Sequence, residues 1–205
     1  AGTPLDLTSH PLSAAAVLAG LVTRANREEL EASIGGPLPA ELPRLESLTE
    51  TLLSEVTQLD AAGAGVRVML SMLDTAVADP NSLDERTCLL LGLMLRRIEL
   101  RDRVWMLINP ANADDHVRLW GALVARMPPT LAAAPLCLLG MAAWLNGEGA
   151  LLNCCCGRLA VVAPDYSLGT LLAEISERAL PPSIWQELGG EVQRRSQKHP
   201  APLAS

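Results

Sequence analysis

The chain carries five cysteines, and three of them are consecutive, at residues 154–156 in the segment LLNCCCGRL. Thiolates bind zinc and carry out redox chemistry, so the run raises the question of a metal or redox site. The segment has the composition of a helix, in which consecutive side chains point about 100° apart. Three adjacent helical cysteines therefore cannot all face one tetrahedral metal ion.

The remaining cysteines, Cys88 and Cys137, are isolated in the sequence. Cys137 could at most approach Cys155 or Cys156 across a helical hairpin. Because a buried free cysteine behaves as a small apolar residue, we interpret the run as core packing and keep a redox or metal role as the alternative. We expect no cofactor and no bound metal.

A second group of chemistry-bearing residues lies in DDHVRLW, where Asp114, Asp115 and His116 are adjacent. These side chains could bind a cation. Carboxylates in a first helical turn more often stabilise the positive end of the helix, and we favour that role.

A third group lies in ELRDRVW, which brings Arg101 and Asp102 together. We interpret it as a buried ion pair that anchors helices, with ligand binding as the alternative. His10 and His199 have no carboxylate or cysteine close in sequence, and no serine lies in a nucleophile-elbow setting. The sequence therefore yields no catalytic set.

Composition narrows the class of fold and of partner. The chain of 205 residues is 49% hydrophobic, lacks Phe and has a single Tyr, which favours helices because aromatic residues are common in strands. A formal net charge of −7 argues against general binding of nucleic acid. No apolar run reaches the ~18 residues of a membrane span. Cysteines without the spacing of a secreted domain suggest a reducing compartment, so we expect a cytoplasmic protein.

Apolar spacing predicts an all-α bundle of about eight to ten helices. The expected helical segments are 43–60, 66–77, 87–95, 98–108, 114–127, 133–145, 150–162, 167–178 and 183–195. The first two are joined by a short break, so we expect antiparallel neighbours. TCLLLGLML, residues 87–95, is apolar on every side and should be the central buried helix. The four tryptophans lie on apolar stripes and are expected to be core anchors.

The segment IGGPLPAELP, residues 34–43, is the best candidate for a domain boundary because it is rich in Gly and Pro. It divides the chain into a helical segment and linker at 1–43 and a helical domain at 44–197. A disordered tail follows at 198–205.

Short helices with tight turns invite a test for tetratricopeptide repeats. If Pro164 closes such a unit, the Leu-Gly position falls on Leu139 and Gly140, and the turn falls on residues 147–149. Gly140 would then let the second helix approach closely. We expect tetratricopeptide-like antiparallel hairpins in the second half, and a generic helical hairpin is the alternative.

Several blocks together resemble a known family. The blocks are GTPLDL, REEL, ELRDRVW, AAWLNGEGALLN, APDYSLGTLLAEI and LPPSIW. In order and spacing they are similar to an actinobacterial family known as domain of unknown function 4192. The resemblance implies that a further N-terminal portion precedes the first block, so we expect the C-terminal part of a longer protein. It supplies no activity, and it implies that the cysteine run departs from the family pattern.

Two hypotheses for function remain. The preferred one is a non-catalytic helical interaction or scaffold module that binds a partner protein or self-associates. The rival is an enzyme or small-ligand-binding protein whose pocket is completed by the N-terminal portion; we lean against catalysis. The candidate ligand or partner contacts are Arg101, Asp102, Trp144, Glu148 and Tyr166.

Overall fold

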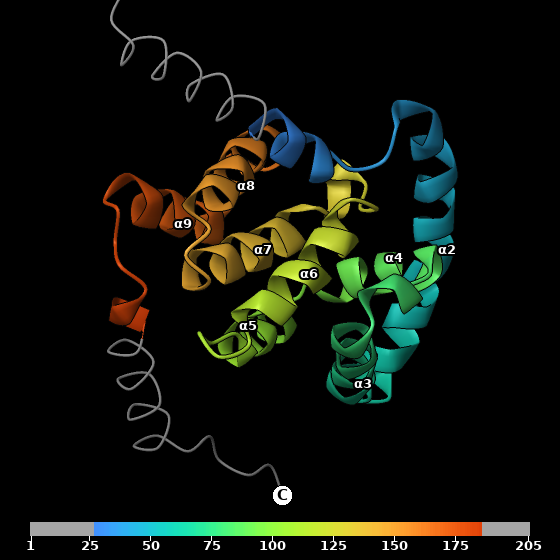
Figure 1. The fold of residues 1–205 in the computed structure, drawn as a ribbon. Coiled ribbons are helices and arrows are strands. Elements are labelled where there is room, and N and C mark those ends of the chain that lie inside the picture. The colour runs from blue at the N-terminus through green and yellow to red at the C-terminus, as the bar shows by residue number, and fades with distance from the viewer. Residues whose placement is uncertain (1–26, 186–205) are drawn as a thin grey trace, which may run out of the picture.

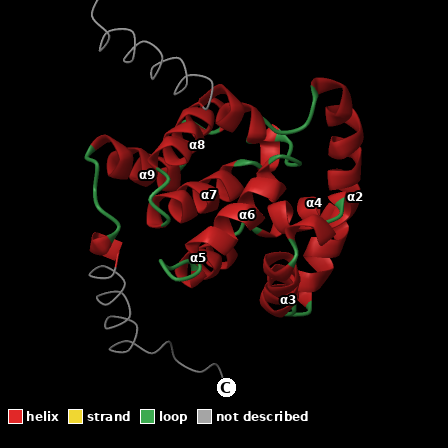
Figure 2. Cartoon of the chain, viewed as in Figure 1, coloured by secondary structure: helices red, strands yellow, loops and turns green. Residues whose placement is uncertain are grey.

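The computed structural model describes residues 27–185, and every regular element in that range is a helix or a 3-10 turn (Figures 1 and 2). The predicted all-α class is confirmed. After a helix at residues 27–33, the elements are η1 (Pro39–Glu41), α2 (Leu42–Ala61), α3 (Gly65–Ala78), η2 (Pro80–Ser82), α4 (Glu85–Met94), α5 (Ile98–Leu107), α6 (Ala113–Val124), η3 (Pro129–Leu131), α7 (Ala133–Leu145), α8 (Gly149–Val162) and α9 (Ser167–Glu177).

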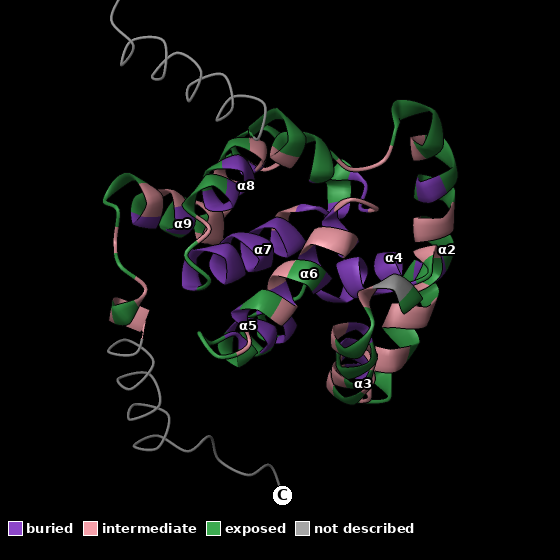
Figure 3. Ribbon diagram, in the orientation of Figure 1, coloured by how far each residue is buried: buried purple, intermediate pink, exposed green. Residues whose placement is uncertain are grey.

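Helix α7 is the centre of the bundle (Figure 3). Every residue from Ala134 to Leu145 is buried, and the helix packs against α6, α8 and α9. A helix that is apolar on all sides is stable only when neighbours surround it. Helix α4 is also buried from Cys88 to Met94, as its sequence predicts. The central position, which the sequence analysis assigned to residues 87–95, belongs to α7.

Helices α7 and α8 form a tight hairpin. Gly147 reverses the chain between them with φ of +79°, a conformation that glycine adopts without steric cost. A Cβ on Gly140 would stand 3.4 Å from the Cβ of Cys155 in α8, which is an ordinary contact, and 3.0 Å from Cδ1 of Leu172 in α9, so the missing side chain makes room chiefly for α9 and not for the second helix of the hairpin. The tetratricopeptide register of this hairpin stays a prediction.

The N-terminal half is built around α2, α3 and α4. The chain bends by 118° between α2 and α3, so these helices are splayed and not the antiparallel neighbours expected from their short connection. Helix α2 packs instead against α4. Arg44 pairs with Glu85, and Arg86 pairs with Glu55, across this contact. No single helix within residues 27–185 is long and apolar enough to cross a membrane. Helices α2 and α3 together meet that length and composition, but the chain bends between them.

The helix of residues 27–33 lies beside α8 (Figure 1). Ile34 at its end is buried in the common core, and Leu30 packs against that core. The division predicted at residue 43 stays a prediction. The predicted tail at 198–205 and most of the predicted helix 183–195 lie outside the described residues.

Candidate functional site

Three of the five predicted contact residues meet where α5 faces the start of α9. The buried Arg101 donates from Nη1 to the Tyr166 hydroxyl at 2.9 Å, and its Cζ lies 5.4 Å from the centre of the Tyr166 ring. Its Nε and Nη2 donate to Oδ1 of Asp102 at 2.9 and 2.7 Å. Three guanidinium nitrogens thus have partners within the protein.

The interaction of Arg101 that joins two helices is not the buried ion pair with Asp102 that the sequence predicted. Arg101 is buried, but the side chain of Asp102 is 56% exposed and belongs to the same helix. The contact that joins distant parts of the chain is the hydrogen bond from Arg101 to Tyr166. Burial raises the pKa of Tyr166, and the guanidinium opposes that rise. The hydrogen bond therefore has the geometry of a structural contact that holds α5 against the start of α9.

Trp144 and Glu148 lie apart from this cluster. Trp144 is buried near the end of α7, and its Nε1 donates to the carbonyl of Leu180 at 2.7 Å. Tyr166 precedes α9 and Leu180 follows it, so the length of α9 separates the two aromatic residues. Glu148 accepts from Nδ2 of Asn146 at 2.6 Å in the hairpin turn. The five predicted contacts therefore do not form one site.

The three consecutive cysteines face three different neighbours. Cys154 lies near Arg27 and Glu31, Cys155 packs against α7, and Cys156 lies near α9. Burial raises the pKa of all three thiols, which keeps them protonated. Within residues 27–185, no cluster of three His, Cys, Asp or Glu side chains is arranged to hold a metal ion.

The acidic start of α6 is engaged within its own helix. Asp114 and Asp115 both pair with Arg118. His116 points into the core, where its Nδ1 accepts a hydrogen bond from Nε1 of Trp120 at 3.2 Å. Burial lowers the pKa of His116, because the charged imidazolium would lose its hydration. These three residues therefore do not converge on a common point.

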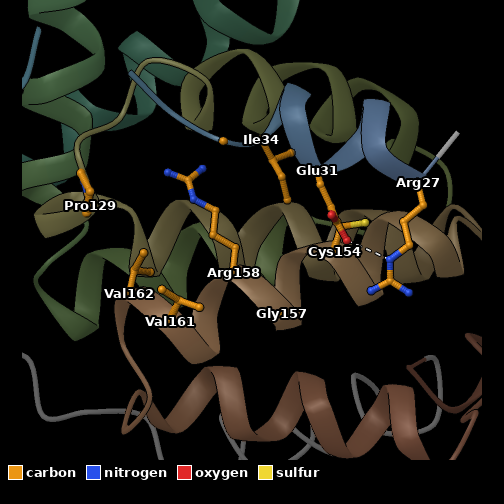
Figure 4. A pocket seen from close by; sticks show the side chains of 10 residues that line it. Arg27, Glu31, Ile34, Pro129, Cys154, Gly157, Arg158, Val161 and Val162 are labelled. Carbon is orange, nitrogen blue, oxygen red and sulfur yellow. Dashed lines mark hydrogen bonds and ion pairs between the residues drawn. The ribbon is translucent and has the colours of Figure 1, made fainter. Parts of the chain in front are cut away.

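A groove of about 530 Å³ runs between the helix of residues 27–33 and α8 (Figure 4). We call it the α8 groove. Its α8 wall is a stripe that recurs every three or four residues, which is one face of a helix. The stripe consists of Cys154, Gly157, Arg158, Val161 and Val162. The adjacent face of α8 packs into the core through Leu151, Cys155 and Leu159.

Arg158 is the unusual member of this apolar stripe. Its side chain rises from α8 toward the segment after helix 27–33 (Figure 4). Nη1 is buried and has no hydrogen-bond partner among the described residues. A Cβ on Gly36, whose φ is +84°, would stand 2.5 Å from Nη2, so the guanidinium occupies the space that a side chain would fill. Burial lowers the pKa of Arg158, and the Cys155 thiol opposes that shift.

The other charges of the α8 groove compensate each other. Arg27 donates from Nε to Oε1 of Glu31 at 2.8 Å, one helical turn away. The groove therefore holds one neutralised pair and one guanidinium without a counter-charge among its lining residues. Such a site offers hydrogen-bond donors and positive charge to an anionic group within an apolar surface.

The α8 groove was not predicted from the sequence, although part of its signal is present there. The segment 149–162 contains a second apolar stripe, and Arg158 is the single charged residue in it. No acidic residue stands three or four positions from Arg158, so no pairing within the helix was available to it. What the sequence could not supply is the opposing wall, which comes from residues more than 100 positions earlier.

A family model described as a domain of unknown function (DUF4192) matches residues 1–183. No curated protein and no solved structure matches the chain.

Proposed function

The chain belongs to the DUF4192 family, and since that description assigns no activity, we propose from its geometry that the protein is a non-catalytic helical interaction module. The docking surface is the α8 groove, and its occupant is a short apolar peptide segment of a partner protein. The observation that carries the proposal is the stretch of α8 that lines this groove, where Gly157 and Val161 are exposed beside the buried Cys154 and the half-buried Arg158 and Val162. Ligand sites in proteins are typically concave and lined mainly by apolar side chains with a few polar groups.

The open side of the groove favours a peptide over a small molecule. Val161 on its rim is 81% exposed, and Gly157 is exposed as well. Small-molecule sites usually enclose most of the ligand surface. A peptide can leave part of itself in solvent and continue over the rim, as helices or extended segments do in apolar grooves.

The reactive side chains support a non-catalytic role. Burial raises the pKa of every cysteine, and the protonated thiol is a poor nucleophile. His116 is buried and accepts from Trp120, so it is not offered to a substrate. Arg101 and Tyr166, which the rival enzyme hypothesis uses, are bonded to each other. The five free cysteines also support a reducing, cytoplasmic compartment, which we include in the proposal.

The experiment compares two glycine variants of the full chain. A random library of twelve-residue peptides displayed on phage is selected against the wild-type protein, and the best peptides are synthesised. Gly157→Gln places a bulky polar side chain in the groove, and Gly121→Gln makes the same change in α6, outside the groove. A Cβ at either glycine meets no atom within 4 Å, so both variants should fold.

We expect Gly157→Gln to weaken peptide binding about tenfold or more, and Gly121→Gln to leave it within about twofold. Isothermal titration calorimetry measures both. If the library yields no binding peptide, or if the two variants bind the selected peptides equally well, the α8 groove is not the docking surface.

A further inference from the structure

We infer that the segment docked in the α8 groove carries one carboxylate flanked by apolar residues, and that Arg158 binds this carboxylate and selects the partner. The inference rests on the proposed function, because it names the chemistry of the peptide that the groove accepts.

Arg158 has a hydrogen-bond donor that no acceptor satisfies among the described residues. Its Nη1 is buried within the protein surface but has no acceptor among residues 27–185. Buried polar atoms of folded proteins are nearly always hydrogen-bonded, and a charged donor without an acceptor is especially unfavourable. Arg158 as a whole is only half-buried and lines the groove, so a docked segment can bring an acceptor to the guanidinium.

The guanidinium of Arg158 is held in place against the backbone of Gly36. Gly36 has no side chain, and its positive φ carries the backbone past the guanidinium at a distance that no Cβ would allow. Arg158 is thereby held against the backbone rather than free in solvent. A preorganised planar fork favours a carboxylate, whose two oxygens match two parallel N–H donors.

The charges that line the groove favour a ligand with a single negative charge. Arg27 and Glu31 neutralise each other, which leaves one positive charge at Arg158. A single carboxylate balances that charge. A doubly charged phosphate would bring a second negative charge into a groove whose wall already contains Glu31, and this is unfavourable in an apolar setting.

The position of Arg158 within the stripe determines the sequence pattern expected of the peptide. Arg158 lies in the middle of its stripe, one helical turn from Cys154 on one side and from Val161 and Val162 on the other. A carboxylate at Arg158 therefore has apolar surface on both sides. The matching sequence is an acidic residue with apolar residues before and after it.

The test is a double-substitution cycle between protein and peptide. Peptides selected from the twelve-residue library against the full wild-type chain are made in two forms, with the acidic residue and with the corresponding amide. Each form is titrated against the wild-type chain, Arg158→Gln and the control Arg118→Gln. Arg118 is an exposed arginine of α6, so the control makes the same change of net charge away from the groove.

We expect acidic residues to be enriched in the selected peptides. The change from acid to amide should weaken binding to the wild-type chain and to Arg118→Gln about tenfold or more, and binding to Arg158→Gln by less than about twofold. Arg158→Gln removes a charge that has no partner, so it should fold and melt at the same temperature as the wild-type chain or higher. A lower melting temperature would assign Arg158 a structural role and overturn the inference.

Two failures are distinguishable. Peptides that depend on Gly157 but show no preference for an acid overturn the inference and leave the proposed function in place. Peptides that do not depend on Gly157 overturn both.

Two other occupants of the groove would give different results. Either result would overturn the inference that a separate partner protein binds there. Association of the chain with itself that is lost in Arg158→Gln, measured by sedimentation, would identify a second copy. Asp6 is the single acidic residue of segment 1–26. Equal losses of stability in Asp6→Asn and Arg158→Gln, with no further loss in the double variant, would identify the chain's own carboxylate.

Discussion

The contact between Arg158 and Gly36 can be tested by comparing two glycines with nearly the same backbone conformation. Gly36 has φ of +84° and Gly147 has φ of +79°, but a Cβ on Gly36 would stand 2.5 Å from Nη2 of Arg158, whereas a Cβ on Gly147 would meet no described atom within 4 Å. Gly36→Ala and Gly147→Ala therefore share the conformational effect and differ in the steric one.

The expected magnitudes follow from these two effects. A left-handed conformation costs an alanine about 1–2 kcal/mol, and this is the whole expected loss for Gly147→Ala. Gly36→Ala adds a steric cost, because Nη2 must move and the carbonyl oxygen of Met127 stands 3.1 Å from the new Cβ. The addition is about 1 kcal/mol if Arg158 swings into solvent and up to about 3 kcal/mol if the backbone shifts instead.

Urea unfolding monitored by circular dichroism measures both losses. Each kcal/mol also lowers the melting temperature by about 2–4 °C in a chain of this size. In an Arg158→Ala background, the extra cost of Gly36→Ala should fall below about 1 kcal/mol, because the crowding guanidinium is gone. Equal losses of unfolding free energy for Gly36→Ala and Gly147→Ala would refute the contact between Gly36 and Arg158. An extra loss for Gly36→Ala that persists in the Arg158→Ala background would refute it as well.

Three further predictions concern the residues that first suggested chemistry. Replacing the run Cys154–Cys156 by three alanines should preserve the helical circular dichroism spectrum and lower the free energy of unfolding by about 1–3 kcal/mol, since one sulfur is lost at each position. Loss of bound zinc on this change, measured by elemental analysis, would contradict the packing role. Because burial lowers the pKa of His116, the unfolded chain binds a proton there that the folded chain refuses, so stability should fall as pH drops below about 6.5. Urea unfolding at pH 7.5 and 5.5 should show that acidification lowers the stability of His116→Gln, which cannot titrate, by less than that of the wild-type chain. Equal losses of stability would contradict a neutral, buried His116 that accepts a hydrogen bond from Trp120. Tyr166→Phe removes the acceptor of the buried Arg101 and should cost about 1–3 kcal/mol in the same assay, whereas a loss below about 0.5 kcal/mol would show that this hydrogen bond does not fasten α5 to α9.

The fold class was predictable because apolar residues recur at helical spacing along most of the sequence. Helix α2 has its apolar residues on one face, and α4 and α7 are apolar on all faces, so their burial follows from composition alone. Trp105, Trp120 and Trp144 are buried as their stripes indicated. The position of Gly140 against Cys155 was predictable as well, because a hairpin with so short a turn brings these two positions together.

Partners chosen by tertiary packing were not predictable. Asp102 follows Arg101 directly in sequence and suggested an ion pair, but the side chain that joins Arg101 to another helix is Tyr166, 65 residues away. The bend of 118° between α2 and α3 likewise depends on α4, which takes the place of an antiparallel neighbour. Local spacing constrains which face of a helix is buried, but it does not specify what covers that face.

The cysteine run and the α8 groove are two consequences of one helical geometry. Because neighbouring positions of α8 point about 100° apart, the run cannot enclose a metal ion, and the same rotation assigns its members to different surfaces. Cys155 belongs to the contact with α7, whereas Cys154 begins the stripe that continues through Arg158 to Val161. The cysteine run is therefore a set of small residues that reaches from the face packed against α7 to the wall of the groove. The residue with unsatisfied chemistry is the arginine one turn later, which no motif marks.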